Sequence, residues 1–348
     1  MTTSLVNVCA NDLEIFSREI FKRAGLSEEH AQTQANILVW ANLRGIDSHG
    51  VLRIPRYLGW LQKGIMNSVP NISITKQTPS SVLIDADKAP GALSMSFAME
   101  QSIEKAQKAG IGWAFVKHTT HSGPVGYYAQ LAVREEMVGI VIVTSRPNMA
   151  YFGSKAAGVA TNPIAIAVPG GPDGSVMLDM ASSELAIGKI KDALAREAVL
   201  PEGGALTKEG RPTTDPAEAA IPMPLGGAKG SGLSLMFETL VSLLIGNPLL
   251  EPALAGREQD HSQNGLAIAV NISTFTDIDD YKKCMTTLAQ ALKELPPMKS
   301  GGEIFLPGEI EIRKLEERRR VGIPIPTRIW NQLSASAKTL NVPMPETT

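Results

Sequence analysis

The sequence predicts an α/β (α+β) fold built as a helical domain made from both chain ends and a central domain that mixes strands with helices. Three observations support it. The first seventy residues carry mostly helical apolar patterns, and from Asn71 onward short β-branched runs alternate with helices. The C-terminal part resembles the N-terminal part in composition, which favours their packing together. We therefore expect residues 1–70 and 305–348 to form the helical domain, and residues 71–304 to form the α/β domain.

The N-terminal region predicts three helices. Gly25 is placed to end an amphipathic first helix. Ser27 can cap the second helix, and the acidic residues that follow it suit the first turn of a helix. That second helix leads into a polar turn at residues 47–50, and a third helix follows over residues 55–64.

The central region predicts strands separated by helices. Within it, the Gly- and Pro-rich residues 185–223 predict a short helix and then a long loop. Two C-terminal helices are expected at residues 308–320 and 326–340, followed by a loosely held tail over residues 341–348. The central strands are expected at residues 81–84, 112–116, 138–144, 164–168, 176–178 and 266–270, and the central helices at residues 92–108, 125–135, 230–244 and 278–293.

Composition limits the classes of function. At 348 residues the chain is long enough for two domains. Its 33 Lys and Arg residues nearly balance 35 Asp and Glu residues, and the formal charge of −2 argues against nucleic acid or an anionic membrane as a partner. Cys9 and Cys284 lie in no ligand-like spacing, which favours a reducing compartment. Because no signal peptide and no membrane-spanning apolar run is visible, we expect a soluble cytoplasmic protein.

The stretch from Arg44 to Arg53 gathers a histidine, a hydroxyl, a carboxylate and two guanidinium groups around two glycines. Histidine exchanges protons near neutral pH, so we interpret His49 as a catalytic proton donor or acceptor. Arg53 is a candidate clamp for a substrate carboxylate, and Ser48 could orient the imidazole. The alternative is that Asp47 or Ser48 caps a helix and His49 is a surface turn residue. The first interpretation predicts an enzyme that moves a proton on a small acid.

A second candidate site lies at residues 117–123, where a predicted strand ends before a predicted helix. Ligand groups often occupy such positions in α/β folds. His121 could orient a substrate there, beside the free N–H groups of the helix N-terminus. His118 and His121 could also hold a metal, although the segment is not helical and no carboxylate or cysteine joins them. Ordinary helix capping is a further alternative, with Thr119, Thr120 or Ser122 as the cap.

Two more segments could contact a phosphate or a ribose. Residues 226–232 form a Gly-rich loop before a helix, where backbone N–H groups can approach an anion and Lys229 adds charge. Asp179 follows a predicted strand and could bind a ribose hydroxyl. Ser182 or Ser183 could cap a helix that faces a phosphate, and a simple N-cap is the alternative. Neither G-x-G-x-x-G nor G-x-x-x-x-G-K-[ST] occurs, so a Rossmann or P-loop turn is not expected.

Six segments share their residue types and their order with one enzyme family. They are Gly45 to Tyr57 (GIDSHGVLRIPRY), His121 to Gly123, Gly158 to Pro163, Leu178 to Ser183, Gly227 to Leu233 and Leu306 to Glu309. Together they resemble the type-2 malate/L-lactate dehydrogenase family, which includes ureidoglycolate dehydrogenase, sulfolactate dehydrogenase, 2,3-diketo-L-gulonate reductase and Δ1-piperideine-2-carboxylate reductase. The segments span nearly the whole chain, and their order is a stronger signal than any one of them.

The resemblance implies reduction of a small 2-oxo acid or cyclic 2-imino acid by NADH or NADPH, or the reverse oxidation. It also implies a non-Rossmann cofactor-binding α/β domain, a helical domain from both chain ends, and a homodimer with no metal. His49 and His121 match alternative proton donors or acceptors of the family. Tyr57 and Thr161 lie in the matching segments and join Arg53 as candidate substrate-binding residues. The implied cofactor-binding residues are Asp179, Met180, Ala181, Ser182, Ser183, Ala228, Lys229, Gly308 and Glu309.

The sequence departs from the family pattern in two places. Residues 186–189 read Ala-Ile-Gly-Lys where many relatives have Ala-Arg-Gly-Lys, and residues 117–120 replace an Asn-Ser-Asn-like run. Both departures leave open the cofactor and the substrate, which could be malate, lactate, ureidoglycolate, sulfolactate, a keto-sugar acid or a cyclic imine carboxylate. Two other functions also stay open: a metal-assisted hydrolase that uses His118 and His121, and a non-catalytic binding protein on the same scaffold.

Overall fold

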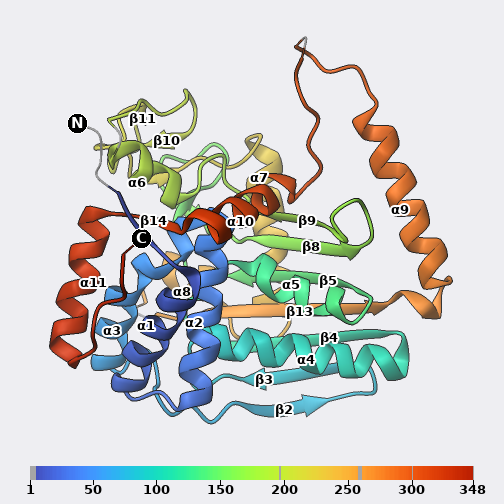
Figure 1. The fold of residues 1–348 in the computed structure, drawn as a ribbon, viewed down its shortest axis with the longest axis horizontal. Helices are drawn as coiled ribbons and strands as arrows, with labels where there is room; N and C mark the ends of the chain where they lie inside the picture. The colour runs from blue at the N-terminus through green and yellow to red at the C-terminus, as the bar shows by residue number, and fades with distance from the viewer. Residues whose placement is uncertain (1–4, 196, 258–260, 300, 348) are drawn as a thin grey trace.

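A seven-stranded sheet lies at the centre of the computed structural model, which describes residues 5–195, 197–257, 261–299 and 301–347 (Figure 1). Its strand order is β2-β3-β4-β13-β5-β8-β9, and only the β3–β4 pair is parallel. This is not the parallel order of a doubly wound sheet. The strands are β2 (Ser73–Gln77), β3 (Ser81–Asp85), β4 (Ile111–Thr119), β13 (Gln263–Asn271), β5 (Met137–Thr144), β8 (Ile164–Pro169) and β9 (Ser175–Met180).

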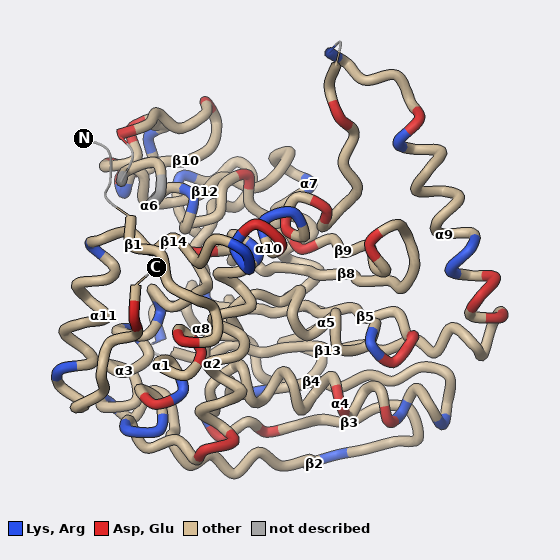
Figure 2. Tube along the Cα trace, viewed as in Figure 1, with Lys and Arg blue, Asp and Glu red and all other residues tan. Residues whose placement is uncertain are grey.

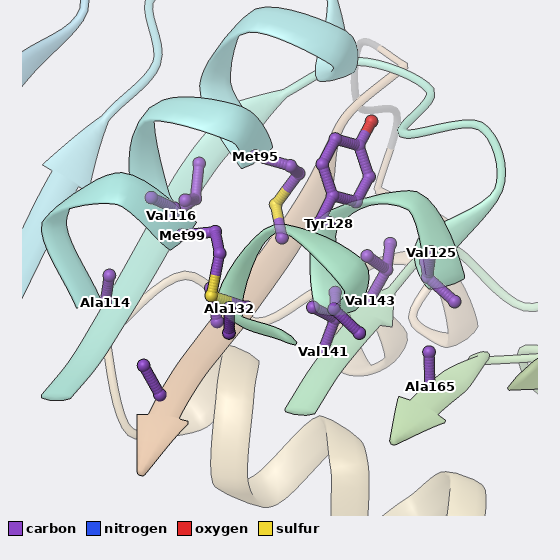
Figure 3. Close-up of a cluster of buried hydrophobic side chains, with 14 of the residues drawn as sticks. Met95, Met99, Ala114, Val116, Val125, Tyr128, Ala132, Val141, Val143 and Ala165 are labelled. Carbon is purple, nitrogen blue, oxygen red and sulfur yellow. The ribbon is translucent and has the colours of Figure 1, made fainter. Parts of the chain in front are cut away.

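Two helices cover one face of this sheet. They are α4 (Gly91–Ala109) and α5 (Val125–Arg134), and both are amphipathic. Alternate residues of β4 point at them, so that Ala114 and Val116 are buried while their neighbours are half-buried. Figure 3 shows how the side chains of the two helices meet those of the strands. The labelled members of this core are Met95, Met99, Ala114, Val116, Val125, Tyr128, Ala132, Val141, Val143 and Ala165.

Two glycines let these helices approach the sheet closely. A Cβ atom on Gly112 of β4 would lie 1.8 Å from the carbonyl oxygen of Ser102 in α4. A Cβ atom on Gly139 of β5 would lie 2.2 Å from the carbonyl oxygen of Ala129 in α5. The helix and strand backbones therefore pack closely at both points. The close packing of α5 on β5 fixes this helix on the sheet, and the candidate site lies at its N-terminal end.

The opposite face of the sheet is covered by α7 (Ala228–Phe237) and a π-helical turn over residues 238–243. Phe237 and Val241 pack there on Ile142, Leu266 and Ile268 of the sheet. The predicted helix at residues 230–244 is thus confirmed in place, but its second half is wound more loosely than an α-helix. Its outward side carries several exposed apolar residues: Leu233, Leu235, Met236, Leu240, Leu243 and Leu244.

Both chain ends pack into one helical layer beside the sheet (Figure 1). β1 (Leu5–Val8) pairs antiparallel with β14 (Ile323–Pro326), and one core joins residues from both ends, among them Phe21, Tyr57, Ile325 and Leu333. The exact division into two domains stays a prediction, and residues 1–4 and 348 lie outside the described residues. The helices of this layer are α1 (Ala10–Arg23), α2 (Glu28–Leu43), α3 (Ile54–Gln62), α10 (Glu309–Val321) and α11 (Thr327–Leu340).

Most predicted elements are confirmed, including the Ser27 cap, whose hydroxyl accepts a bond from His30 N. The prediction of a loose tail is wrong: Val342 is 8% exposed and Thr347 forms a β-bridge with Val8. In residues 185–223, α6 (Ile187–Ala195) is the short helix that the sequence predicts. The segment after it, predicted as a long loop, instead contains a small sheet, because its turns bring short runs of residues together. That sheet contains β10 (Ala205–Leu206), β11 (Pro212–Thr213) and β12 (Ile221–Pro222).

Further short elements occur beyond those the sequence predicted. The edge strand β2 was not expected, because its exposed, polar sequence lacks an apolar alternation. The remaining short elements are β6 (Met149–Ala150), β7 (Ala157–Val159), α8 (Leu250–Leu254) and 3₁₀ turns at Asp47–His49, Val51–Arg53 and Ile272–Thr274.

One helix stands away from the body of the protein. The predicted helix α9 (Ile278–Lys293) projects from the sheet, and the chain returns from it as an extended arm (Figure 1). Ala289 is its single buried residue, while Leu288, Leu292 and Leu295 are exposed. Figure 2 shows charges of both signs interspersed along α9 and α10. Among the described residues, no helix is long and apolar enough to cross a membrane.

Candidate active site

Two histidines from distant loops meet at the junction of the helical layer and the sheet. The rings of His49 and His121 stack with their centroids 5.5 Å apart and their planes 16° apart. Ser48 Oγ lies 2.9 Å from His49 Nδ1, and Tyr57 Oη lies 2.6 Å from His121 Nδ1. The structure therefore brings together four of the predicted site residues, and each imidazole has a hydroxyl that can orient it.

The loop that carries His49 is fixed from behind by Asn42, the penultimate residue of α2. Its Nδ2 donates to Asp47 Oδ1 at 2.6 Å, and its Oδ1 accepts from Val51 N at 2.8 Å. A Cβ atom on Gly50 would lie 2.2 Å from that Oδ1, so the position has no room for a side chain. From α10, Arg318 donates to both carboxylate oxygens of Asp47, at 2.7 and 2.9 Å, and to Asn42 O.

The loop that carries His121 is fixed by the sheet. Thr120 donates its backbone N–H and its hydroxyl to Ala89 O, and Ser122 donates to Gln263 Oε1 of β13. A Cβ atom on Gly91 would lie 2.5 Å from His121 O, so the start of α4 also presses on this loop. Helix α5 has no side-chain cap, so the alternative that Thr119, Thr120 or Ser122 caps it is wrong.

The hydrogen bonds around His121 assign its tautomer. Gly123 N can only donate, and it lies 3.3 Å from His121 Nδ1, so this nitrogen accepts. The Tyr57 hydroxyl then also donates to Nδ1, and the ring proton resides on Nε2. His121 is thus arranged as a neutral ring whose Nε2 has no hydrogen-bond partner among the described residues and can contact a substrate.

Burial and positive charge keep both imidazoles neutral. Burial, together with the charge of Arg53, lowers the pKa of His49 to about 3. The same two causes hold the pKa of His121 well below its usual value, with further contributions from His49, Arg56 and His261. Burial raises the pKa of Tyr57 to about 12. An anion bound here would offset the positive field and favour protonation of the rings.

Arg53 lies beside this pair and is half-buried. Its Nε donates to Ser48 O at 2.7 Å, which ties the guanidinium to the His49 loop. Among the described residues, its other N–H groups have no hydrogen-bond partner. A carboxylate could accept from them in the two-pronged geometry that arginine favours.

Sequence reasoning missed a second ring cluster next to the pair. The ring of Trp60 lies 4.4 Å from the ring of His261, and the guanidinium of Arg56 lies 4.6 Å above Trp60. Burial, with the charges of Arg56 and Arg146, lowers the pKa of His261 to about 4, and its Nε2 is buried with no partner in the described part of the chain. No motif surrounds His261, and the only signal available was that histidine occurs five times in the chain.

The predicted cofactor segments converge on one another. Ser182 N donates to Thr161 O, and Leu225 N, next to the Gly-rich loop, donates to Ser182 O, each at 3.0 Å. Met177 N donates to Pro307 O, which places Gly308 against β9 just before Asp179. A Cβ atom on Gly188 would lie 2.3 Å from Ser48 Cβ, so α6 brings this region into contact with the His49 loop.

Several features of these segments fit a ligand that carries phosphates and hydroxyls. Ser183 Oγ is buried and has no partner among the described residues. Gly226 and Gly227 have φ of +55° and +63°, a conformation that glycine adopts without strain, and the N–H of Gly227 donates to Pro224 O at 3.0 Å. Lys229 is exposed beside them at the N-terminus of α7. A nicotinamide dinucleotide therefore fits the residues present, with Met180, Ala181 and Ala228 on the same segments.

Two predicted cofactor residues have defined protein partners. Asp179 is open to solvent, but surrounding protein raises the pKa of its carboxyl to about 6, although a 2.9 Å bond from Gly126 N opposes this. Glu309 is 6% exposed; its oxygens accept from Leu306 N and pair with Lys293 at 2.7 Å. Asp179 can therefore still reach a ligand, whereas the Glu309 side chain serves the start of α10.

The arrangement does not support the metal alternative. His118 lies against Asp85, with its Nδ1 3.1 Å from Oδ2, whereas His121 faces Tyr57. Within the described ranges, no group of three or more His, Cys, Asp or Glu side chains is placed to hold a metal ion.

Comparison with known proteins points to one family. Its model, described as malate/L-lactate dehydrogenase, matches residues 8–334. The L-sulfolactate dehydrogenase of Methanocaldococcus jannaschii is 37% identical over 93% of this chain and 94% of its own, and the NAD(+)-dependent ureidoglycolate dehydrogenase of Escherichia coli O157:H7 is 31% identical over 90% and 91%. The crystal structure of malate dehydrogenase from Entamoeba histolytica superposes with a TM-score of 0.92 at 27% identity, covering 99% of this chain and 100% of that one.

Proposed function

The chain belongs to the malate/L-lactate dehydrogenase family, and from that premise we propose that it interconverts a small 2-oxo acid, or cyclic 2-imino acid, and the corresponding 2-hydroxy or 2-amino acid with NADH or NADPH. The observation that carries the proposal is the stacked pair of His49 and His121, backed by Ser48 and Tyr57 beside Arg53. The convergence of residues 161, 179–183 and 226–229 supports a cofactor site next to it.

The proposed roles of the residues follow from their contacts. Arg53 binds the substrate carboxylate through the N–H groups that have no partner in the described part of the chain, and so orients C2. A bound nicotinamide provides hydride transfer to or from C2. In reduction, one ring of the pair, protonated once the substrate anion is bound, gives its proton to the substrate atom that gains charge and becomes neutral; in oxidation the neutral ring takes that proton back. Tyr57 and Ser48 hold the rings in place, and the bound carboxylate partly cancels the positive field that keeps them neutral.

We infer that a substrate with a second anionic group fits better than a simple monocarboxylate. Arg56 and Arg146 add positive charge around His261, on the Trp60 side of the pair. Sulfolactate and malate, named for relatives, carry a second anion of this kind. The direct test is a panel of 2-oxo acids, 2-hydroxy acids and cyclic imines, with consumption of NADH or NADPH measured by absorbance. Absence of turnover with every pair would overturn the proposal.

We further propose a homodimer. The exposed apolar side chains of α9 and of residues 233–244 form apolar patches on the surface, and such patches often mark protein–protein interfaces. Leu292→Glu should increase the monomer fraction measured by light scattering, whereas Thr287→Glu, on another side of α9, should leave it unchanged. A monomeric wild-type protein would contradict this. The two free, exposed cysteines, Cys9 and Cys284, agree with the proposed cytoplasmic location.

A further inference from the structure

A second group of arginines lies outside the site described above, in an open cavity of about 550 Å³. The cavity lies between α1, α2, α5 and α10. Arg44 at the end of α2, Arg134 at the end of α5, and Arg319 of α10 all line it. None of the three was assigned a role by the motifs of the sequence.

Arg44 is buried and forms no ion pair with any of the described residues. It is 6% exposed, and its guanidinium lies 4.7 Å above the ring of Trp40. Of its five N–H groups, one makes a long bond of 3.4 Å to Gln130 Oε1, and its Nε has no partner within the described residues. Burial of a cation is costly unless an anion accompanies it. The buried guanidinium is therefore an unsatisfied donor group in the wall of a cavity.

The other charged side chains around the cavity do not neutralise the guanidinium of Arg44. Arg134 and Arg319 are exposed and make no hydrogen bond or ion pair in the part of the chain that the structure describes, and their charges add to that of Arg44. Two acidic residues are near. Glu14 lines the cavity and accepts from Gln32 Nε2 at 2.7 Å, and Glu311 acts on Arg44 only from a distance. An excess of positive charge remains.

We propose that this cavity binds a phosphate group, held by Arg44, Arg134 and Arg319. Phosphate carries up to two negative charges and several acceptor oxygens, so donors from three helices can bind it together. The ring of Trp40 holds the guanidinium of Arg44 in place by a cation–π contact.

The phosphate can come from two sources. One is a free phosphate or small phosphorylated molecule. The other is the 2′-phosphate that distinguishes NADPH from NADH, and this source rests on the proposed function. Helix α5 links the cavity to the candidate cofactor segments, because Gly126 near its start donates to Asp179 at 2.9 Å and Arg134 at its end lines the cavity. Both sources use the same chemistry at the three arginines.

The first arm of the test uses inorganic phosphate and needs no turnover. Thermal unfolding of the full-length protein should show a saturable rise in Tm with phosphate, beyond that of potassium chloride at equal ionic strength. Arg44→Gln should abolish the rise. The double variant Arg134→Gln/Arg319→Gln keeps the test valid if Arg44→Gln fails to fold. Arg320→Gln removes an equal charge from α10 at a position that does not line the cavity, and should behave as wild type.

The second arm measures the affinities of NADH and NADPH by fluorescence. If the site takes the cofactor's phosphate, the double variant should weaken NADPH about tenfold to a hundredfold and leave NADH unchanged. If it takes free phosphate, both affinities should stay and the phosphate-dependent rise in Tm should be lost. If the protein binds phosphate but neither NADH nor NADPH, the proposed dehydrogenase function is overturned and the proposed phosphate site is supported. No phosphate effect on wild type, together with unchanged NADPH affinity in the variants, would overturn this inference.

Discussion

The two loops that supply the stacked histidines are held by different parts of the molecule. The His49 loop is clamped by Asn42 and by Arg318, which comes from α10 in the C-terminal part of the chain. The His121 loop is held by Ala89 and by Gln263, the first residue of the central strand β13. The stacking of the two rings therefore depends on how the helical layer docks on the sheet. Substitutions in the helical layer and substitutions in the sheet should therefore have different effects on the two histidines.

The largest expected effect separates the two rings by their roles. Replacing the true proton carrier by alanine should lower kcat by roughly 10²- to 10⁴-fold, because charge would then develop on a buried atom with no proton donor. His49→Ala and His121→Ala, each assayed in steady-state turnover, identify which ring it is. His118→Ala is the control, since its 44% exposed side chain pairs with Asp85. If both variants stay within a few-fold of wild type, neither ring carries the proton.

Acid should destabilise the protein through the same pair. The folded-state pKa of His49 is about 3, below the 6.5 of an unperturbed histidine, so the unfolded chain binds more protons below pH 6.5. The stability this ring contributes is present above pH 6.5 and is lost as the pH falls toward 3. Between pH 7 and pH 5 the loss should be about 2 kcal/mol for this ring. Urea unfolding at both pH values checks it, and His49→Gln should show a shallower dependence.

Removing the hydroxyl behind His121 should have a smaller effect. Tyr57→Phe deletes the 2.6 Å bond to Nδ1, worth about 1 kcal/mol, and frees the ring to turn. We expect kcat to fall roughly tenfold with a smaller change in KM, and its pH profile to shift, because the ring then titrates without its partner. Tyr281→Phe on α9 is the matched control. An unchanged pH profile would show that Tyr57 only fills space.

The smallest expected effect tests the clamp on the His49 loop. Asp47→Asn weakens the pair with Arg318, and because Asp47 is partly exposed the loss of stability should be about 1 kcal/mol or less. Activity should fall further than with Glu317→Gln, which removes a surface pair with Lys314. Denaturant unfolding and turnover measured on both variants decide this. Equal activity in the two would mean that α10 does not position His49.

Local signals were sufficient for much of the fold and for part of the site. Ser27 caps a helix through contacts within one turn, so its prediction needed no tertiary information. The resemblance to the family predicted that His49 and His121 are both site residues, whereas the stacking of their rings was not predicted and depends on tertiary packing. By contrast, His261 reaches the site only through the packing of its loop on Trp60, and nothing in its neighbours in sequence encodes that contact.

The errors have a common physical cause. The tail at residues 341–348 was predicted to be loose from its position, but burial of Val342 against the helical core decides its state. Arg44 was noted only as the edge of a polar motif, whereas its burial without an anion depends on α5 and α10. Long-range packing therefore set what composition and periodicity left undetermined.

The bond between Asp47 and Arg318 joins residues 271 positions apart, so it has a consequence for synthesis on the ribosome. The His49 loop emerges early, but its clamp is translated near the end. The nascent chain therefore carries the His49 loop without its clamp through most of translation, and the bond to Arg318 can form only once α10 has left the exit tunnel. A chain terminated before that helix would contain all the strands of the central sheet but would lack Arg318, which holds the His49 loop.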